Sequence, residues 1–416
     1  MKSIAIVGAG QSGLQLALAL QDRGYEVTVI SNRTAEQIRA GKVMSSQCMF
    51  GASLQTEREL GLNSWDQDCP PIEGFGITVA NLEQPATPLI DWVAPLNVHA
   101  QSVDQRLKMP AWMDEFERRG GQLVIKDAGV DELEELSLCH DLVVVAAGKG
   151  DIVKLFERDA TRSVFDCPQR ALALTYVTGT VPRSPLPGVT FNVIPGIGEW
   201  VMFPGLTTSG PCEIMSFFGI PGGPLDCWAD VKTPEQHLEK SLSILETYLP
   251  WGAERCRDAQ LTDDNGILSG RLAPTVRKPV VRLPSGRFVL GMADVVVVND
   301  PINGQGSNNA AKCAMSYLQS ILELENRQPT PEWMQQAFER FWSYAEYVVT
   351  WTSAMLRPPE PHILNLLGVA GQVPAIARAT VNGFDHPPSL FPWWTDAKEC
   401  NRFIERHTSE EVLAPH

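Results

Sequence analysis

Short apolar runs separated by a glycine-rich turn make up the beginning of the chain. Ile4 to Val7 is an apolar run that is typical of a buried strand. The leucine-rich stretch of residues 14–20 predicts an apolar helix, which we expect to end at Gly24. Val27 to Ile30 predicts a second strand. This order of strand, turn, helix and strand is typical of a dinucleotide-binding fold.

Later stretches predict a second sheet and further helices. Residues 43–100 are rich in Gly, Pro and Ser and contain only short apolar pieces, and the chain beyond Pro331 is largely helical in pattern. Five aromatic residues in that last part have near-helical spacing, and we expect them to pack against the rest of the protein: Trp333, Phe338, Phe341, Trp342 and Trp351. The other elements we expect are a helix from Pro110 to Arg119, a strand from Leu142 to Ala147, an antiparallel sheet from Ala171 to Gly219, a helix from Pro234 to Tyr248, a strand from Phe288 to Gly291 and a helix from Asn308 to Leu324.

The composition is typical of a globular protein and argues against nucleic-acid and membrane partners. Of its 416 residues, 44% are hydrophobic and 20% charged, and the net charge is -15. An acidic surface repels phosphate, so we expect no nucleic-acid partner. There is no apolar leader, and no apolar run approaches the roughly 18 residues of a spanning helix. We therefore expect a cytoplasmic protein that does not bind a membrane.

Cysteines and histidines predict neither disulfides nor a metal site. The nine cysteines are scattered without CxxC spacing, as is typical of reduced thiols in a cytosolic protein. The seven histidines lie far apart, and none has the spacing of a helical metal-binding pair. We therefore expect no metal.

A GxGxxG motif lies between the first strand and the first helix. Gly8 permits a tight turn, Gly10 lets the backbone approach a pyrophosphate, and Gly13 lets the helix pack close to the strand. Gln11 and Ser12 begin the helix, whose free N–H groups favour phosphates. The motif predicts dinucleotide binding, and the alternative is a glycine-rich turn without a ligand.

The second strand does not end in the acidic residue that usually binds ribose. Asn32 can still hydrogen-bond ribose hydroxyls, and Arg33 can stack on or pair with the adenosine part of a cofactor. The alternative is that both are ordinary loop residues. The missing acid weakens a prediction of NAD more than one of FAD, which has other anchors.

A second glycine motif follows the strand that ends at Gly291. The segment reads Gly-Met-Ala-Asp at 291–294 and Asp-Pro-Ile-Asn-Gly-Gln-Gly-Ser-Asn-Asn-Ala at 300–310. It resembles the late motif of the FAD-dependent aromatic hydroxylases. The resemblance implies that Asp294 holds a ribityl or pyrophosphate oxygen, and that the turn opens a helix beside the flavin pyrimidine. The residues implied in this second part are Pro301, Gly304, Gln305, Gly306, Asn308 and Asn309.

Two further flavin contacts are expected from the same resemblance. Arg106, within Asp-Gln-Arg-Leu, matches an arginine that points at the FAD phosphates, and the alternative for it is a surface ion pair. Gly148 ends the apolar strand near the chain centre. Single-component hydroxylases carry an Asp-Gly motif there that also serves NADPH, and this chain lacks it. No second GxGxxG is present, which favours a protein that does not reduce its own flavin.

Over nearly its whole length the chain is similar to the styrene and indole monooxygenases. The stretches that carry this resemblance are IAIVGAGQSGL, VDQRLKMP, CPQRALAL, GMADVVVVNDPINGQGSNNA and VVTWTSAML. Six positions match the indole-type rather than the styrene-type set, and the alternative for them is plain core. They are Ser45, Gln47, Met49, Ile72, Phe75 and Ala100, of which the first three are expected to position the substrate.

The resemblance implies the oxygenase component of a two-component enzyme. A separate NADH-dependent flavin reductase would supply FADH2, which reacts with O2 to give a C4a-hydroperoxyflavin. Its distal oxygen would epoxidise indole, giving indoxyl and then indigo, and also styrene-like alkenes and aryl sulfides. The substrate is thus a small apolar aromatic molecule. Two alternatives stay open: a self-sufficient NAD(P)H-dependent hydroxylase, and a non-catalytic binder such as the GDP-dissociation inhibitors.

The elements and the resemblance together predict an α/β fold. We expect a Rossmann-like FAD-binding domain of the aromatic hydroxylase and glutathione reductase type, an antiparallel-sheet substrate domain and a helical C-terminal region. The FAD-binding domain is expected at residues 1–42, 99–165 and 271–327, the substrate domain at 43–98 and 166–270, and the C-terminal region at 328–416.

Overall fold

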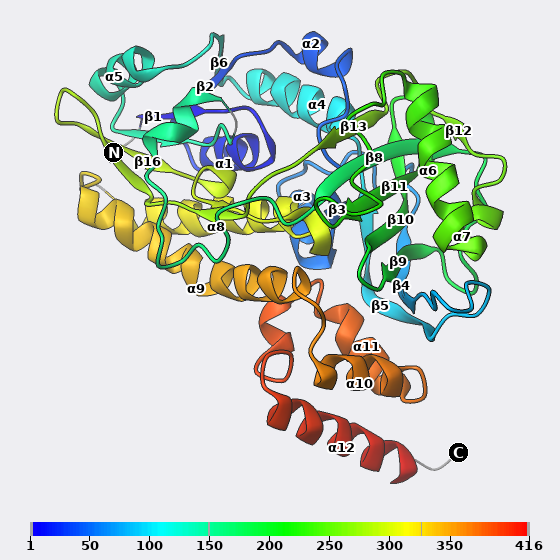
Figure 1. Ribbon diagram of the computed structural model, residues 1–416. Coiled ribbons are helices and arrows are strands. Elements are labelled where there is room, and N and C mark those ends of the chain that lie inside the picture. The colour runs from blue at the N-terminus through cyan, green and yellow to red at the C-terminus, as the bar shows by residue number, and fades with distance from the viewer. Residues whose placement is uncertain (1–2, 149, 326, 414–416) are drawn as a thin grey trace.

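The computed structural model describes residues 3–148, 150–325 and 327–413, and its N-terminal part is built on a mostly parallel sheet (Figure 1). The strand order is β15-β16-β7-β1-β2-β6, and only β15 runs antiparallel to its neighbour. The strands are β1 (Ser3–Val7), β2 (Glu26–Ser31), β6 (Gln122–Ile125), β7 (Leu142–Val145), β15 (Val280–Arg282) and β16 (Phe288–Gly291). The central strands β1 and β7 are buried almost throughout, as expected of a parallel sheet covered on both faces.

Helices connect and cover this sheet. Helix α1 packs against both α8 and α4, and side chains of all three belong to the core of the dinucleotide-binding unit. The helices are α1 (Gln11–Gln21), α2 (Ala35–Arg39), α4 (Gln105–Arg118), α5 (Val130–Cys139) and α8 (Gly306–Leu324), with a 3-10 turn η1 (Asp151–Leu155) after β7.

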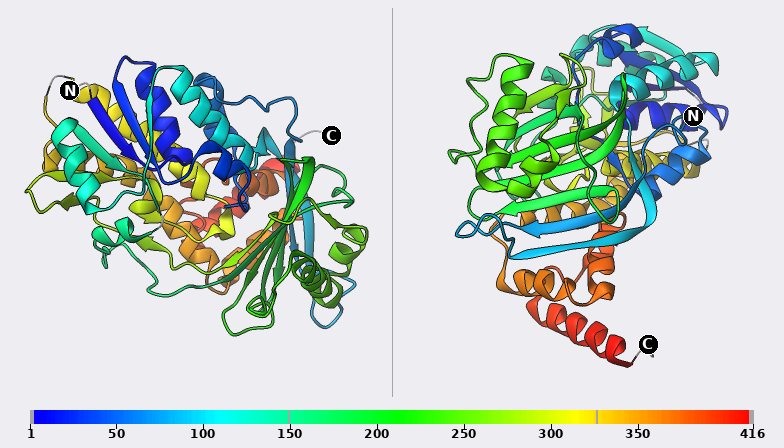
Figure 2. Two further views of the ribbon diagram at one scale, coloured as in Figure 1. Left: turned by 90° about the horizontal axis from the view of Figure 1, so that it is seen from above. Right: turned by 90° about the vertical axis from the view of Figure 1, so that its right-hand side faces the viewer.

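A second, larger sheet stands beside this unit (Figure 2). Its order is β12-β8-β11-β10-β9-β4-β5-β3, with β13 also paired to β8, and all its pairs are antiparallel except β4 with β9. The strands are β3 (Cys48–Met49), β4 (Ile72–Val79), β5 (Ile90–Ser102), β8 (Ala171–Thr178), β9 (Gly188–Ile194), β10 (Gly198–Thr207), β11 (Gly210–Gly219), β12 (Gln260–Leu261) and β13 (Ile267–Gly270). Helices α6 (Pro234–Tyr248) and α7 (Pro250–Arg255) cover one of its faces.

The C-terminal helices pack against the other face of the second sheet. Side chains of β4, β5, β10 and β11 share a core with α9, α10 and α11, and α9 also packs against α8. The chain ends in α12, which projects beyond the rest of the molecule (Figure 1). These helices are α9 (Pro331–Met355), α10 (Pro361–Ala370), α11 (Pro374–Asn382) and α12 (Ala397–Leu413), and the remaining short elements are α3 (Gly51–Glu59), β14 (Thr275–Val276), β17 (Val297–Val298), η2 (Ala293–Val295), η3 (Pro301–Asn303) and η4 (Pro387–Leu390).

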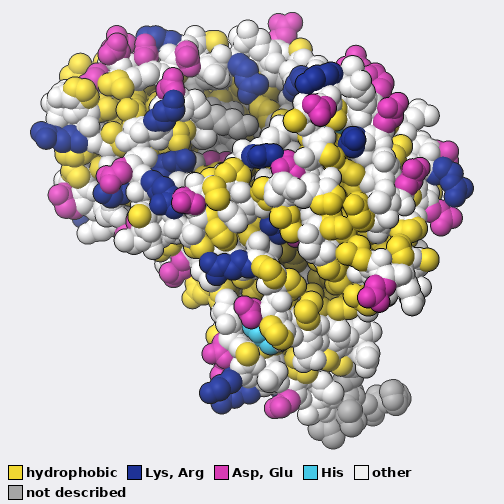
Figure 3. Space-filling view, viewed as in Figure 1, with side chains coloured by type: hydrophobic (Ala, Val, Ile, Leu, Met, Phe, Trp, Pro, Cys, Tyr) yellow, Lys and Arg dark blue, Asp and Glu magenta, His cyan; other side chains and the backbone are white. Residues whose placement is uncertain are grey.

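The predicted fold class is confirmed, as is the packing of the late aromatic residues. Phe338, Phe341 and Trp351 are at most 1% exposed, and Trp333 and Trp342 pack against the core. On the face shown in Figure 3, hydrophobic side chains are spread over the second sheet and its junction with the C-terminal helices. Charged side chains gather mainly over the dinucleotide-binding unit and along the outer edges.

Residues 43–100, whose apolar runs are short, nevertheless form the long strands β4 and β5. Two glycines interrupt the apolar pattern of β4. A Cβ on Gly76 would lie 2.5 Å from the guanidinium carbon of Arg183, and one on Gly74 would lie 3.1 Å from Leu186. Glycine is normally unfavourable in strands, but here it lets other side chains lie flat on the sheet.

The predicted start of the helix at Pro110 was also wrong, because α4 begins at Gln105. The Asp104 side chain caps it by accepting a hydrogen bond from the Arg106 backbone nitrogen at 2.8 Å. Proline is common at the start of a helix, which favoured the wrong boundary, but this helix contains it in its interior.

All nine cysteines are free thiols. Within the described ranges, no helix is both long and apolar enough to cross a membrane. The same residues include no cluster of His, Cys, Asp and Glu that could hold a metal ion.

Candidate functional site

The glycine turn after β1 is shaped for a close approach to the start of α1. Gly8 has a φ of +122°, and a Cβ on it would lie 2.7 Å from the Ala147 backbone nitrogen. A Cβ on Gly13 would lie 2.0 Å from the Gly8 carbonyl oxygen, so only glycine lets the helix pack this close. By contrast, no described atom lies within 4 Å of the Cβ position of Gly10. The turn therefore leaves free the space where a diphosphate would meet the helix N-terminus.

Three more residues predicted to contact the cofactor lie at the carboxyl ends of β2 and β7, the two strands on either side of β1. Asn32 is exposed just beyond β2, and the half-buried Arg33 donates from Nη2 to the Met44 sulfur at 3.0 Å. Gly148 follows β7, on the other side of β1, and packs directly against the side chain of Asp294. The two flavin motifs, far apart in sequence, thus meet at one edge of the sheet, where nucleotides bind in such folds.

The late glycine turn places buried polar atoms at the start of α8. Gly304 has a φ of +65°, and it leads from η3 into the helix. Gln305 donates from Nε2 to the Phe384 carbonyl at 2.7 Å, but its Oε1 and the Oδ1 of Asn309 have no partner among the described residues. Pro301 and Gly304 border a cavity, and no described atom lies within 4 Å of the Cβ position of Gly306.

The side chain of Asn308 ties this turn to the segment before α3. Its Oδ1 accepts from the Phe50 backbone nitrogen at 2.9 Å, and its Nδ2 donates to the carbonyls of Cys48 at 2.8 Å and Gly304 at 3.0 Å. Asn308 therefore fixes the position of the turn, and its amide is fully used by the protein itself.

These features fit FAD. In the part of the chain that the structure describes, no side chain caps the N-terminus of α1 or of α8, so both helices keep backbone N–H groups for a ligand. Buried amide oxygens without partners are costly, and a flavin ring offers N–H groups that can satisfy them.

Gln11, expected to bind the cofactor, directs its side chain into the protein. Its Nε2 donates to Glu57 Oε1 at 2.9 Å and to Gln15 at 3.0 Å. Glu57 also forms an ion pair of 2.9 Å with Lys108, and both side chains are only 1% exposed. Only the backbone of Gln11 is thus left for a phosphate, and the buried ion pair beneath α1 was not predicted from the sequence.

Arg106 is buried, so the alternative of a surface ion pair for it was wrong. Its guanidinium is paired with the carboxylates of Asp104 and Asp263, and its side chain is 3% exposed. Two carboxylates already balance its charge, so its contact with the FAD phosphates stays a prediction that this geometry does not favour.

A cavity lies between the second sheet and the late glycine turn. Its volume is about 30 Å³, enough for one or two waters, so an aromatic ligand requires its side chains to move. Phe384, from the segment after α11, lies against Phe75 with 4.2 Å between ring centroids and the ring planes tilted by 34°, and it meets Trp351 edge-on at 4.7 Å. The lining residues are Ser46, Cys48, Phe50, Phe75, Val189, Phe191, Val201, Phe203, Ser216, Phe218, Pro301, Ile302, Asn303, Gly304 and Phe384.

Of the six residues expected around the substrate, only Phe75 lines this cavity. Ile72 and Ala100 are cross-strand partners in β4 and β5, and both are fully buried. Met49 packs against Leu54 and Ala311. The structure therefore does not gather the six around this cavity, although Ser46 and Cys48 alternate with the first three along the chain.

Ser45 forms hydrogen bonds with other residues of the protein, whereas the side chain of Gln47 has no hydrogen-bond partner among the described residues. The Ser45 hydroxyl accepts a hydrogen bond from Gln105 Nε2 at 3.0 Å, and its carbonyl accepts one from the Tyr176 hydroxyl at 3.0 Å. Gln47 is 4% exposed and has a φ of +36°, and neither side-chain amide atom has a partner among the described residues. A strained residue with an unsatisfied buried amide is typical of a ligand-binding position.

Asp300 forms a buried acidic position beside the cavity. Its Oδ1 accepts from the Ile302 backbone nitrogen at 3.1 Å, and its Oδ2 has no partner in the described ranges. Arg170 and Glu199, a buried ion pair at 2.8 Å, lie close enough to act on its charge. Burial raises the pKa of the Asp300 carboxyl to about 7, against the opposing effects of the Ile302 N–H and Arg170. The sequence motif contains this residue, but its burial could not be read from the motif.

Two family models match parts of the chain. The family described as the styrene monooxygenase A substrate binding domain matches residues 148–255, which contain β8 to β11. The family described as pyridine nucleotide-disulphide oxidoreductase matches residues 3–45, which contain the first glycine turn.

Known proteins and solved structures are similar to most of the chain. Styrene monooxygenases StyA from Pseudomonas fluorescens and from Pseudomonas sp are each 31% identical over 327 residues, covering 77% of this chain and 77% of the relative. The fold is shared with a flavin-dependent brominase at a TM-score of 0.68 and 14% identity, covering 98% of this chain and 99% of the other. It is also shared with p-nitrophenol 4-monooxygenase from Pseudomonas putida at a TM-score of 0.62 and 13% identity, covering 93% and 99%. The chain therefore belongs to the styrene monooxygenase family and is an FAD-dependent monooxygenase.

Proposed function

We propose that the chain is the oxygenase component of a two-component flavin monooxygenase, and that it epoxidises indole. Styrene-like alkenes and aryl sulfides are further substrates. A separate NADH-dependent reductase supplies FADH2, because the chain has a single dinucleotide motif. The named activity of the StyA relatives supports the epoxidation of an alkene bonded to an aromatic ring.

The observation that carries the choice of indole is the buried amide of Gln47, which has no partner among the described residues and whose chain neighbours Ser46 and Cys48 line the aromatic cavity. Indole presents a flat apolar surface and one N–H group. An apolar wall alone would leave that N–H unsatisfied, at a cost of about 1–3 kcal/mol. The Gln47 carbonyl oxygen can accept it, and Ser45, whose hydroxyl already binds Gln105, is less available.

The residues of the chain position the substrate and exclude water from the site. Bound reduced FAD, with O2, supplies the electrophilic oxygen atom. The phenylalanines of the cavity hold the aromatic ring and keep the site dry, and the start of α8 offers N–H groups to a negatively charged flavin ring. The protein needs no acid or base to activate the alkene, because the oxygen donor is the electrophile.

The test uses the purified chain with FAD, O2, NADH and an unrelated flavin reductase. We expect indole to give the blue product indigo, and styrene and thioanisole to give the epoxide and the sulfoxide, only when the reductase is present. Equal product without reductase would instead show a self-sufficient hydroxylase. If the protein binds FAD but oxygenates none of the three, the proposed function is wrong.

The role of Gln47 can be tested with indole and indene, which share a bicyclic shape but differ in the N–H group. Replacing Gln47→Leu should lower kcat/KM for indole relative to indene by about tenfold. Ser216→Ala removes a polar group of the cavity wall itself and serves as the matched control, with the ratio unchanged. A ratio that changes only in the Ser216 variant would assign the N–H contact to Ser216 instead.

A further inference from the structure

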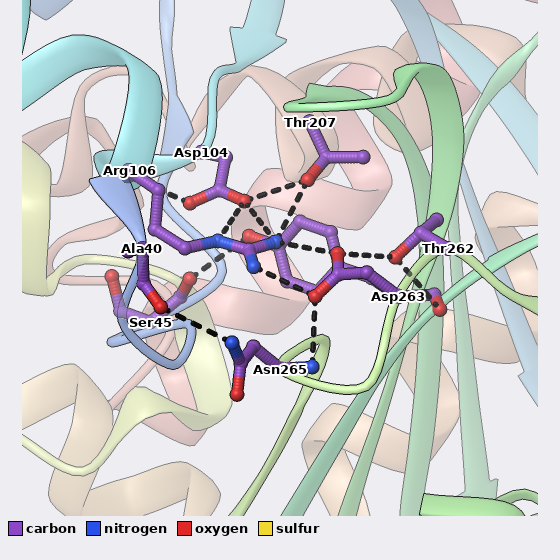
Figure 4. Close-up of polar contacts among 9 residues, drawn as sticks. Ala40, Ser45, Asp104, Arg106, Thr207, Thr262, Asp263 and Asn265 are labelled. Atoms are coloured by element: carbon purple, nitrogen blue, oxygen red, sulfur yellow. Dashed lines mark hydrogen bonds and ion pairs between the residues drawn. The ribbon is translucent and has the colours of Figure 1, made fainter. Parts of the chain in front are cut away.

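A buried ionic network joins helix α4 to the second sheet at Arg106 (Figure 4). Arg106 donates from Nη1 and Nη2 to the two carboxylate oxygens of Asp263, at 2.8 and 2.9 Å. Its Nε donates to Asp104 Oδ2 at 2.9 Å, and its Nη2 also donates to the Thr207 hydroxyl at 3.0 Å. Burial alone would lower the pKa of the guanidinium, but the hydrogen bonds and charges of Asp263 and Asp104 outweigh burial and raise it. The guanidinium therefore keeps its positive charge in this buried position.

Asp263 also shapes the loop that carries it, residues 262–265 between β12 and β13, which we call the Asp263 loop. Its Oδ1 accepts from the Asn265 backbone nitrogen at 2.8 Å, and its Oδ2 accepts from the Thr262 hydroxyl at 3.2 Å. The carboxylate thus serves two purposes, because it both folds the loop and binds it to Arg106.

The Asp263 loop is also hydrogen-bonded to a second segment, residues 40–46, which we call the linking segment. Asn265 donates from Nδ2 to the Ala40 carbonyl at 3.2 Å, and its own carbonyl accepts from the Val43 backbone nitrogen at 3.0 Å. Figure 4 shows the hydrogen bond that joins Asn265 to Ala40 of this segment. Arg106 therefore reaches the linking segment through Asp263 and Asn265.

The linking segment connects the two halves of the functional site. Within it, Met44 contacts the guanidinium of Arg33, at the sheet edge where we expect the dinucleotide to bind. Two residues further along, Ser46 lines the aromatic cavity, and Gln47 follows directly. A shift of this segment must change both the flavin site and the cavity.

We propose that Asp263 is a positioning residue that holds the linking segment against the flavin site and so limits the rate at which flavin leaves. The proposal rests on the proposed function, in which the flavin arrives and departs by diffusion between two proteins. Asp263 is suited to this role because its side chain is 29% exposed while its partner Arg106 is 3% exposed. The loop can therefore open toward solvent, and Arg106 then keeps Asp104 as a counter-charge.

The test compares Asp263→Asn and Asp263→Ala with the unchanged protein, and uses Glu339→Gln as the matched control. Glu339 binds Arg162 through both oxygens at 3.0 and 2.9 Å but lies away from the linking segment. Hydrogen exchange of residues 40–46, measured without flavin, should become faster in both Asp263 variants and stay unchanged in the control. Release of oxidised FAD, followed by stopped-flow mixing with a flavin-scavenging protein, should become ~10-fold faster.

A third variant distinguishes the effect of the contact between the Asp263 loop and the linking segment from the effect of the ion pair. Asn265→Ala removes the contact with Ala40 but leaves Arg106 paired, so it should accelerate exchange and release in the same direction by a smaller factor. Unchanged exchange and release in all the Asp263 and Asn265 variants would overturn the proposal. The release measurement does not depend on turnover. A protein that binds FAD but oxygenates no substrate would therefore disprove the proposed function while leaving this comparison intact.

Discussion

A Cβ atom placed on Gly148 would lie 2.7 Å from the Cβ of Asp294, much closer than two non-bonded carbon atoms approach. Gly148 lies just beyond the end of β7 and Asp294 lies in η2, so two segments 146 residues apart touch at the carboxyl edge of the parallel sheet. The absence of a side chain at Gly148 thus sets where the Asp294 carboxylate lies. Asp294 is expected to hold a ribityl or pyrophosphate oxygen, so this contact should influence flavin binding.

Replacing Gly148→Ala should therefore weaken FAD binding. The added methyl group displaces Asp294, and loss of one hydrogen bond to a charged group corresponds to about tenfold or more in affinity. Fluorescence titration with FAD measures the change, and Asp294→Ala should show a loss of similar size. Gly270→Ala is the control, since no described atom lies within 4 Å of its Cβ position. Normal affinity in both site variants would mean that Asp294 does not bind the flavin.

The two later glycines of the first motif should respond in opposite ways to substitution. Gly10→Val fills open space, so it should abolish FAD binding while the melting temperature of the flavin-free protein stays nearly unchanged. Gly13→Ala would press a methyl group against the Gly8 carbonyl, and should lower the free energy of unfolding by about 1–3 kcal/mol. Thermal and chemical denaturation together with FAD titration distinguish the two. Equal destabilisation by both would contradict the assignment of the open space to a diphosphate.

The elements that could be predicted best from the sequence are those whose geometry depends on residues close together in the chain. The turn from Gly8 to Gly13 could be placed because its geometry requires glycine at fixed spacings within one strand–helix unit. The helix from Pro234 to Tyr248 matched its predicted bounds, since Thr233 caps it and proline follows directly.

What the sequence did not predict depends on contacts between distant segments. Glu57 and Lys108 come from α3 and α4, and no motif contains both, yet together they form a buried ion pair beneath α1. Phe384 is one of many aromatic residues in the C-terminal region, and only the folded chain shows that it covers the cavity. Arg106 was expected to meet a phosphate because its local motif fits one. Its partner Asp263 is 157 residues away, and the pairing could not be read from the motif.

Stability should fall with rising pH because of Asp300. Its carboxyl has a pKa of about 7 in the folded protein against an ordinary value of 3.8, so between about pH 4 and 7 the folded chain holds a proton that the unfolded chain has released. Its contribution to stability is therefore lost as the pH rises through this window. Glu199 and Arg170 are the charged groups that act on it.

Replacing Asp300→Asn should remove this slope. The amide oxygen can still accept from the Ile302 nitrogen, and no charge is buried at high pH. Between pH 5 and 8 the unchanged protein should lose roughly 3 kcal/mol more unfolding free energy than the variant. Denaturant titrations of the flavin-free proteins at both pH values measure the difference. Parallel pH profiles would show that Asp300 has the same charge in both states.

The last prediction concerns the choice between indole and styrene. Replacing Ser45→Asn, Gln47→Val and Met49→His together, toward the styrene-type set, should lower kcat/KM for indole relative to styrene. The reason is that Gln47 carries an unpartnered buried amide, which gains a partner from the indole N–H and gains none from styrene. Met49 packs against Leu54 and Ala311, so part of the triple substitution acts by repacking.

The single substitution Gln47→Val separates these effects and should account for most of the change in the ratio. Both substrates are compared with reduced FAD in excess, so that flavin supply does not limit turnover. If the ratio is unchanged in the single and the triple variant, the selectivity must arise elsewhere in the cavity. Phe203 and Phe218 on β10 and β11 are then the residues to exchange, because both line the cavity.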